Sequence, residues 1–124
     1  MIVGIGTDIV RIDRIQHNIE INERFAERIY TQLEIEYCKS KASLYQSFAV
    51  RFAAKEAMMK ALGTGWDGKV NWTDIEILNT ESGKPMINLT GGALNQYRKL
   101  GIKEAHISLS HEREYAIAYV VLES

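Results

Sequence analysis

The run Arg51–Gly65, R-F-A-A-K-E-A-M-M-K-A-L-G-T-G, constrains the fold more than any other stretch of the chain. Nearly every residue in it is a strong helix former, and Gly63 stands where a C-terminal helix cap belongs. Phe52 and Met59 share one face, which is typical of a helix that packs in a core. The sequence therefore predicts one long helix, over residues 43–62, around which the other elements are arranged.

Positive charge is concentrated along this predicted helix. Five cations and one acid lie between residues 39 and 60, a local charge of +4 in a chain whose net charge is −1. The cations are Lys39, Lys41, Arg51, Lys55 and Lys60, and the acid is Glu56. A cationic helix with one embedded carboxylate can bind an anionic ligand together with a metal ion.

The same residues also fit an ordinary solvated helix surface. Glu56 and Lys60 are four residues apart with the acid first, the favourable order for an exposed ion pair worth about 0.2–0.5 kcal/mol. Arg51 and Lys55 have the same spacing and can both be solvated. On charge pattern alone the solvated surface is the favoured interpretation.

Length and composition predict one globular domain over residues 1–124. The chain has 124 residues, of which 46% are hydrophobic and 25% charged, so it can bury a real core. A domain of this size leaves little room for a deep enclosed site, which favours a site shared between subunits. A net charge near zero argues against a general nucleic-acid binder.

The expected compartment is the cytoplasm. The single cysteine, Cys38, excludes an internal disulfide, which fits a reducing environment. No apolar stretch is long enough to predict a membrane span. The N-terminal residues M-I-V-G-I-G-T-D have neither the basic region nor the apolar core of a signal peptide.

The first residues of the chain predict a strand with an acid beside it. Met1–Gly6 alternates and is β-branched, and the predicted strand ends at Gly6. Asp8 then follows a strand end, where the sheet fixes the backbone and the side chain emerges at an edge. The structural alternative is that Thr7 or Asp8 caps the next helix.

The remaining elements follow from periodicity and turn residues. Ile9, Ile12, Ile15 and Ile19 form one helical stripe, Asn22 can cap a second helix, and Thr31 with Glu34 fits a capping box for a third. After a glycine-rich loop over 63–71, strands are predicted over 72–79, 86–89, 104–110 and 115–122, with a helix over 90–100. Helices lead and strands dominate the second half, so the predicted fold class is α+β.

Two carboxylates stand out as candidates for chemistry. Asp8 and Glu56 are far apart in sequence, but they can meet if the long helix packs on the first strand. Two acids with substrate phosphates and water are the ligands that Mg²⁺ prefers, and Lys60 can neutralise a phosphate. His111, before a predicted turn, can reach a ligand. H-E-x-x-H, C-x-x-C, G-x-S-x-G and Walker motifs are absent from the sequence.

Five stretches in order resemble the holo-acyl-carrier-protein synthase type of 4′-phosphopantetheinyl transferase, over nearly the whole chain. They are G-I-G-T-D-I-V at 4–10, the run at 51–65, D-I-E-I at 74–77, G-K-P at 83–85 and I-S-L-S-H-E-R-E-Y-A-I-A-Y-V-V at 107–121. Together these motifs are highly specific, and the K-E-A-x-x-K core is the strongest of them. The implied fold is a small one in which a long central helix packs on an antiparallel-rich sheet.

The resemblance implies a Mg²⁺-dependent transfer of phosphopantetheine from coenzyme A to a serine of apo-acyl-carrier protein, releasing adenosine 3′,5′-bisphosphate. Asp8 and Glu56 match the metal-binding acids of the family, and Lys60 matches the lysine near the transferred phosphate. These three are the expected catalytic residues. The serine proton can be removed by Glu56 or by a metal-ordered water, and both alternatives stay open.

The resemblance also assigns two binding surfaces and an assembly. The residues expected at coenzyme A are Arg51, Lys60, Gly63, Thr64, Gly65, Lys84, Pro85 and His111. The residues expected at the acidic helix of the carrier protein are Arg14, Arg24, Phe25 and Arg28. Small enzymes of this family resemble trimers with each site between two protomers, so a homotrimer is expected.

Two hypotheses from other classes remain. A non-catalytic module that binds coenzyme A or a nucleotide is the first, although the presence of both acids argues against it. An oligomeric α+β structural protein, whose cationic helix is only a solvated surface, is the second.

Overall fold

The predicted α+β class is confirmed by a computed structural model, which describes residues 1–65 and 68–124. Positions 66 and 67 of the predicted loop lie outside the described residues. The helices are α1 (Ile12–Ile21), α2 (Glu23–Ile29), α3 (Gln32–Lys39), α4 (Leu44–Leu62) and α5 (Gly91–Lys99), with a 3₁₀ turn η1 (Trp72–Asp74). The strands are β1 (Ile2–Arg11), β2 (Ile75–Asn79), β3 (Pro85–Leu89), β4 (Glu104–His111) and β5 (Tyr115–Glu123).

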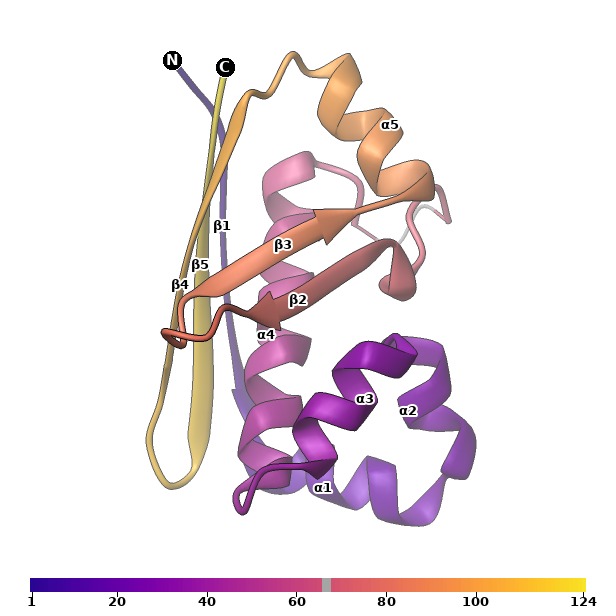
Figure 1. Cartoon of the computed structure of the whole chain (residues 1–124). Coiled ribbons are helices and arrows are strands. Elements are labelled where there is room, and N and C mark those ends of the chain that lie inside the picture. Colours follow the sequence, from indigo (N-terminus) through magenta and orange to yellow (C-terminus); the bar gives the residue numbers. More distant parts are fainter. Residues whose placement is uncertain (66–67) are drawn as a thin grey trace.

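Helix α4 is the centre of the fold. A three-stranded antiparallel sheet, in the order β1-β5-β4, lies along one side of it, and the separate β2–β3 hairpin crosses another (Figure 1). Helices α1, α2 and α3 gather at the N-terminal end of α4 and α5 at its other end (Figure 1). The expected arrangement of a long central helix on an antiparallel-rich sheet is confirmed.

The burial of its side chains matches the central position of α4 in the fold. Thirteen of its nineteen residues are buried, on all sides rather than along one stripe, which is the pattern of a helix enclosed by other elements. The helix ends at Gly63, whose left-handed backbone (φ 75°) lets its N–H reach the carbonyls of Met59 and Lys60. Among the described residues, no helix is both long and apolar enough to cross a bilayer.

Strand β1 lies directly on the backbone of α4. A Cβ atom built on Gly6 would lie 1.9 Å from the carbonyl oxygen of Ala57, and one on Gly4 would lie 2.1 Å from that of Ala61. Only glycines on the strand facing alanines on the helix allow this approach. Because side chains alternate along a strand, Asp8 points to the same face as Gly4 and Gly6.

Strand β1 is longer than the sequence predicted. It runs to Arg11, and Asp8 lies inside it, paired with Ala118. The proposed capping of the next helix by Thr7 or Asp8 is wrong, since α1 begins after Arg11 and has no side-chain cap. Ile9 is paired with Ile117 and 60% exposed on the outer face of the sheet, so it does not belong to the helical stripe. β1 continues past Gly6 because its partner β5 is long enough to pair with it as far as Arg11.

The strand predicted over residues 72–79 begins later, at Ile75. Asn71 and Asp74 form a capping box that holds the three residues before it in the turn η1. The backbone N–H of Asn71 donates to Asp74 Oδ2 at 3.0 Å. The predicted caps are confirmed at Asn22, which accepts from the N–H of Arg24, and in the capping box of α3.

Candidate active site

Asp8, Glu56 and Lys60 form a cluster where β1 lies on α4, so the two candidate acids do meet. Lys60 Nζ lies 3.3 Å from Asp8 Oδ1 and donates to the carbonyl of Thr7 at 2.9 Å. The Asp8 side chain is only 11% exposed, whereas that of Lys60 is 55% exposed. The ion pair of Lys60 is thus with Asp8 across the strand–helix contact, rather than the pair with Glu56 that helical spacing suggested.

The electrostatics of this cluster are dominated by two neighbouring carboxyl groups. The pKa of Glu56 is raised to about 7, first by burial, then by the negative charge of Asp8 and by a hydrogen bond between the two side chains. Lys60 and Arg14 act in the opposite direction but do not cancel these effects. The fold therefore holds two like charges together in a half-buried place.

The donor set fits a hard divalent cation. Carboxylate oxygens from Asp8 and Glu56 are what Mg²⁺ takes from proteins, with water and phosphate oxygens in its other positions. A cation there would remove the repulsion that raises the pKa of Glu56. The residues present therefore fit the metal that the sequence implied.

The glycine-rich loop lies beside the acids. Gly65 lines a small cavity of about 130 Å³ together with Glu56, Met59 and Lys60. Thr64 is buried and Gly63 forms the cap of α4. Of the loop residues expected at coenzyme A, Gly65 thus borders the acid cluster directly.

A second cavity, of about 320 Å³, opens on the other side of Glu56. Arg14, Phe25 and Arg28 line it, so three of the four residues expected at a carrier protein lie next to the acids. Arg24 is exposed and does not line this cavity.

Two aromatic residues that the sequence did not single out as site residues form the wall of this second cavity. Phe52 stacks on Phe25 with ring centroids 6.4 Å apart and on Trp72 with centroids 5.0 Å apart. Phe52 was expected only as a core residue and Trp72 only as part of a strand. Their helical and alternating patterns gave no sign that they would meet beside Glu56.

Arg51, Pro85 and His111 meet in a different place, a cavity of about 450 Å³ between α4, the β2–β3 turn and β4. Arg51 is 3% exposed and donates from Nε to the carbonyl of Ile77 at 3.0 Å. Its guanidinium lies 4.4 Å from the ring centroid of Tyr37, which also lines this cavity. Arg51 is therefore a fixed, buried wall of the cavity and not a solvated cation.

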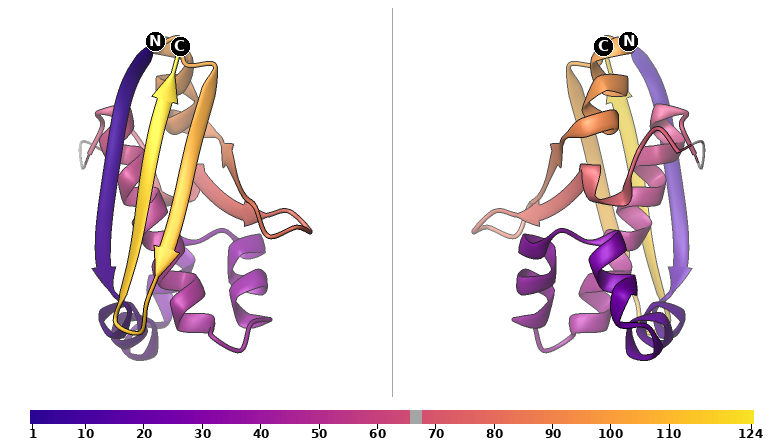
Figure 2. Two further views of the ribbon diagram at one scale, coloured as in Figure 1. Left: turned by 90° about the vertical axis from the view of Figure 1, so that its left-hand side faces the viewer. Right: turned by 90° about the vertical axis from the view of Figure 1, so that its right-hand side faces the viewer.

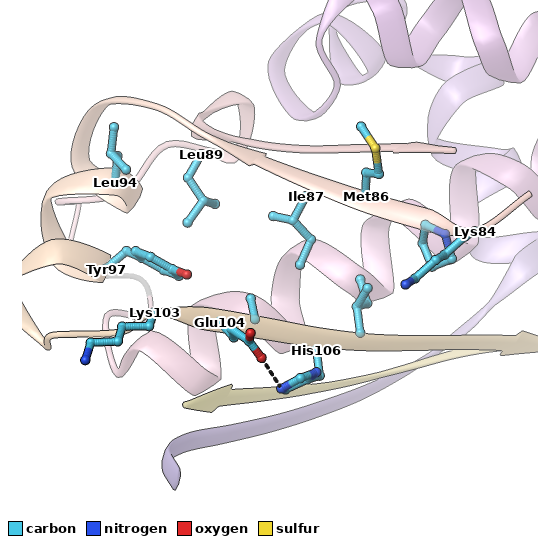
Figure 3. A pocket seen from close by; sticks show the side chains of 12 residues that line it. Lys84, Met86, Ile87, Leu89, Leu94, Tyr97, Lys103, Glu104 and His106 are labelled. Carbon is cyan, nitrogen blue, oxygen red and sulfur yellow. Dashed lines mark ion pairs between the residues drawn. The ribbon is translucent and has the colours of Figure 1, made fainter. Parts of the chain in front are cut away.

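Lys84 lies at the edge of the neighbouring cavity, which is drawn in Figure 3 and has a volume of about 610 Å³. Pro85 and Ile107 line both cavities, so the two are adjacent. The floor of the larger one is apolar, with Ile87 and Leu89 facing β4 (Figure 3).

The expected metal ligand Asp8 and the expected coenzyme A residue His111 lie at opposite edges of the sheet. Asp8 is on β1 and His111 is on β4, and β5 lies between these strands (Figure 2). Two strand spacings separate the edge strands by about 10 Å. One chain therefore does not bring Asp8 and His111 to the same small ligand group.

Lys55 was expected to be a cation that is solvated or free to bind an anionic ligand, and the structure shows that this is wrong. Its side chain is fully buried, with Nζ 2.7 Å from Glu34 Oε1. It also donates to the carbonyls of Trp72 and Ile75, while Glu34 Oε2 accepts from the N–H of Ile77 at 3.0 Å. Lys55 is therefore committed to the core and offers nothing to a ligand.

Comparison with known proteins gives one consistent answer. Residues 4–120 match the sequence profile of the 4′-phosphopantetheinyl transferase superfamily. Holo-acyl-carrier-protein synthases from Solibacter usitatus and Koribacter versatilis are 46% and 48% identical, over 100% and 99% of both chains. A crystal structure of this synthase from Neisseria meningitidis has a TM-score of 0.90 and 38% identity over 100% of both chains. One from Bacillus anthracis, in complex with coenzyme A (3′,5′-ADP), has a TM-score of 0.83 and 40% identity over 100% of this chain and 98% of the other.

Proposed function

Because the chain belongs to the 4′-phosphopantetheinyl transferase superfamily, as a holo-acyl-carrier-protein synthase that moves phosphopantetheine from coenzyme A to a carrier protein, we propose that it does so with Mg²⁺ at Asp8 and Glu56. The observation that carries the proposal is the pair of adjacent carboxyl groups, one of which has a pKa raised to about 7. Such a pair is costly to hold together without a cation, and perturbed groups of this kind are typical of functional sites.

The bound metal would polarise the pyrophosphate of coenzyme A and offset the charge that builds on the leaving group. Lys60, exposed and paired with Asp8, adds a positive charge that can turn to the transferred phosphate. The serine oxygen of the carrier protein attacks the β-phosphorus, and the bond to adenosine 3′,5′-bisphosphate breaks. Glu56 or a water beside it takes the serine proton.

The carrier protein is proposed to dock over α1 and α2. Arg14 and Arg28 are both exposed and border the cavity that leads to Glu56, so an acidic helix lying there would bring its serine toward the metal. Phe25 supplies an apolar contact between them. Arg24, outside the cavity, is proposed only for longer-range attraction.

We further propose that the complete site forms between protomers. The acid cluster at β1 would meet Arg51, Lys84, Pro85 and His111 of a neighbouring chain. Joining the β1 edge of one chain to the β4 edge of the next is a head-to-tail contact, and three such contacts form a closed ring when each turns the chain by a third of a circle. Ile5, Ile9 and Tyr119, exposed by 69%, 60% and 54% on the outer face of the sheet, give such a homotrimer an apolar surface to bury.

The reaction is tested by intact-mass measurement of an apo-carrier protein incubated with this protein, coenzyme A and Mg²⁺, beside an EDTA control. We expect a gain of one phosphopantetheine only when metal is present, and loss of the gain in Asp8→Asn and Glu56→Gln. No gain with any of several carrier proteins, while coenzyme A still raises the melting temperature, would favour the non-catalytic binding module. A gain that survives EDTA would remove the metal from the mechanism.

The shared site is tested by mixing two inactive variants. Glu56→Gln removes the acid half of the site and His111→Ala the other half, so a mixed ring contains one interface in which both halves are intact. We expect transfer to return after the two variants are refolded together and not after either is refolded alone. Failure of the mixture to regain activity, with mixed oligomers detected by native mass spectrometry, would place the whole site in one chain.

A further inference from the structure

A cluster of three ionisable side chains lies on the outer face of the sheet, apart from the Asp8 and Glu56 pair. Glu104 and His106 are on β4 and Glu123 is on β5. One potential ligand atom from each lies within 4.8 Å of the others. Figure 3 shows Glu104 and His106 side by side, joined by their ion pair at the margin of the large cavity.

The sheet fixes the positions of these residues. Glu104 and Glu123 are direct partners across the β4–β5 ladder, and His106 follows Glu104 by two residues. Residues two apart on a strand, and direct cross-strand partners, project from the same face. The convergence of the three side chains is therefore set by hydrogen-bonded backbone and not by a mobile loop.

The arrangement carries an electrostatic conflict. Two carboxylates directly opposite one another on neighbouring strands repel, and His106 lies between them. Its Nε2 is 2.6 Å from Glu123 Oε1 and 3.5 Å from Glu104 Oε2. The three side chains are about half exposed or more, at 53% for His106, 69% for Glu104 and 43% for Glu123. A cation at this point would satisfy both acids together.

We propose that Glu104, His106 and Glu123 form a binding site for a divalent transition metal, with Zn²⁺ as the preferred ion. Ligands about 2.1 Å from a tetrahedral Zn²⁺ lie roughly 3.4 Å from one another. The two separations from His106 Nε2, 2.6 Å and 3.5 Å, bracket that value. A set of one imidazole and two carboxylates leaves a fourth position for water.

The site differs from the Asp8–Glu56 pair in its selectivity. An imidazole ligand favours Zn²⁺ over Mg²⁺, which prefers oxygen ligands alone. Two ions can then bind one chain at separate places, Mg²⁺ at α4 and Zn²⁺ across β4 and β5. Zn²⁺ at this point links the edge strand to the central strand of the sheet and stabilises their pairing.

The test is calorimetric titration of the tag-free full-length protein with Zn²⁺ in excess Mg²⁺, so that the acid cluster at α4 is occupied. We expect one Zn²⁺ per chain and a rise in melting temperature with Zn²⁺. His106→Ala should weaken binding by more than about tenfold, and a Glu104→Gln, Glu123→Gln double variant should abolish it. The matched control is His17→Ala, which removes an exposed histidine on α1 and should bind as the parent does.

A further variant separates this site from the active site. Asp8→Asn combined with Glu56→Gln should retain the Zn²⁺ titration unchanged. Circular dichroism in EDTA checks that each variant is folded before titration. The proposal is overturned if His106→Ala binds Zn²⁺ like the parent, if the Asp8 and Glu56 variant loses the binding, or if no binding at one ion per chain is detected.

Discussion

Lys55 and Glu56 are neighbours on one helix, yet they lie in opposite kinds of environment. Lys55 is fully buried with a carboxylate and two carbonyls around its ammonium. Glu56 is half-buried beside another acid, and its pKa is raised to about 7. Lys55 points to the β2 and α3 side, where its ammonium has three acceptors. Glu56, one residue later on α4, points to the β1 side, where it lies beside Asp8.

The difference separates a charge that holds the fold from one that is available for chemistry. Burial lowers the pKa of Lys55, and the Glu34 carboxylate opposes this effect by stabilising the charged form. The pair connects α3, α4 and β2 through Glu34 and its bond to Ile77. At Glu56 the structure places a second acid, Asp8, beside the carboxyl group, which is stability given up where a cation and an anionic substrate are expected.

Removal of the buried ammonium is expected to have the largest effect on stability. Lys55→Met leaves Glu34 ionised and unpaired in the core, which should lower the free energy of unfolding by about 3–5 kcal/mol. Urea unfolding measures the change. Lys60→Met is the matched control, because its cation is 55% exposed and should cost only about 0–1 kcal/mol. Equal losses in both variants would contradict the distinction between the two sides of α4.

The close contact of β1 with α4 is expected to have the next largest effect. Gly6→Ala places a Cβ atom 1.9 Å from the Ala57 carbonyl oxygen, so the strand must move, at a cost of about 1–3 kcal/mol. The movement also displaces Asp8 from Glu56. The transfer rate should therefore fall by more than the loss of folded protein explains.

Thr7→Ala is the control for this strand, because Thr7 is exposed on the opposite face. It should change the unfolding free energy by no more than about 0.5 kcal/mol. The displacement of Asp8 would be refuted by a Gly6→Ala protein that is destabilised but transfers at the parent rate.

The smallest expected effect is a pH dependence of the unfolding free energy that comes from the titration of Glu56. Its folded pKa of about 7 lies above the ordinary 4.5, so between these values the folded state binds more protons than the unfolded state. The unfolding free energy of the metal-free protein should therefore fall as pH rises from about 4.5 to about 7. The effect is modest because the group is partly exposed to solvent.

Urea unfolding in EDTA across this pH range tests the effect. Glu56→Gln should remove most of the fall, and Mg²⁺ should offset it in the parent protein. Parallel pH profiles for the parent and the variant would show that Glu56 is not the titrating group.

The sequence predicted the elements of the fold well where pattern and turn chemistry agree. The capping box of Thr31 and Glu34 and the cap at Gly63 both appear as expected. Ile9 was misassigned because a spacing of three residues suits a helix, while pairing with Ile117 keeps it in the strand. Local patterns cannot report a partner strand that lies more than a hundred residues away.

The candidate site shows the same limit more sharply. The meeting of Asp8 and Glu56 was predicted on the condition that the long helix packs on the first strand, and Gly4 and Gly6 provide that contact. The burial of Lys55 was not predictable, because its partner Glu34 is on another helix. The spacing of four residues between Arg51 and Lys55 places both on one face of the helix, but it does not tell whether that face is exposed or buried.

The most direct test of the account is to measure unfolding and Mg²⁺-dependent transfer on one preparation of Glu56→Gln. Glu56→Gln should unfold with a free energy no lower than that of the parent at neutral pH, because it removes the repulsion from Asp8, and its transfer rate should fall on the order of 10²–10³. Transfer at the parent rate would contradict the role of Glu56. A large loss of stability would show that Glu56, like Lys55, holds the fold.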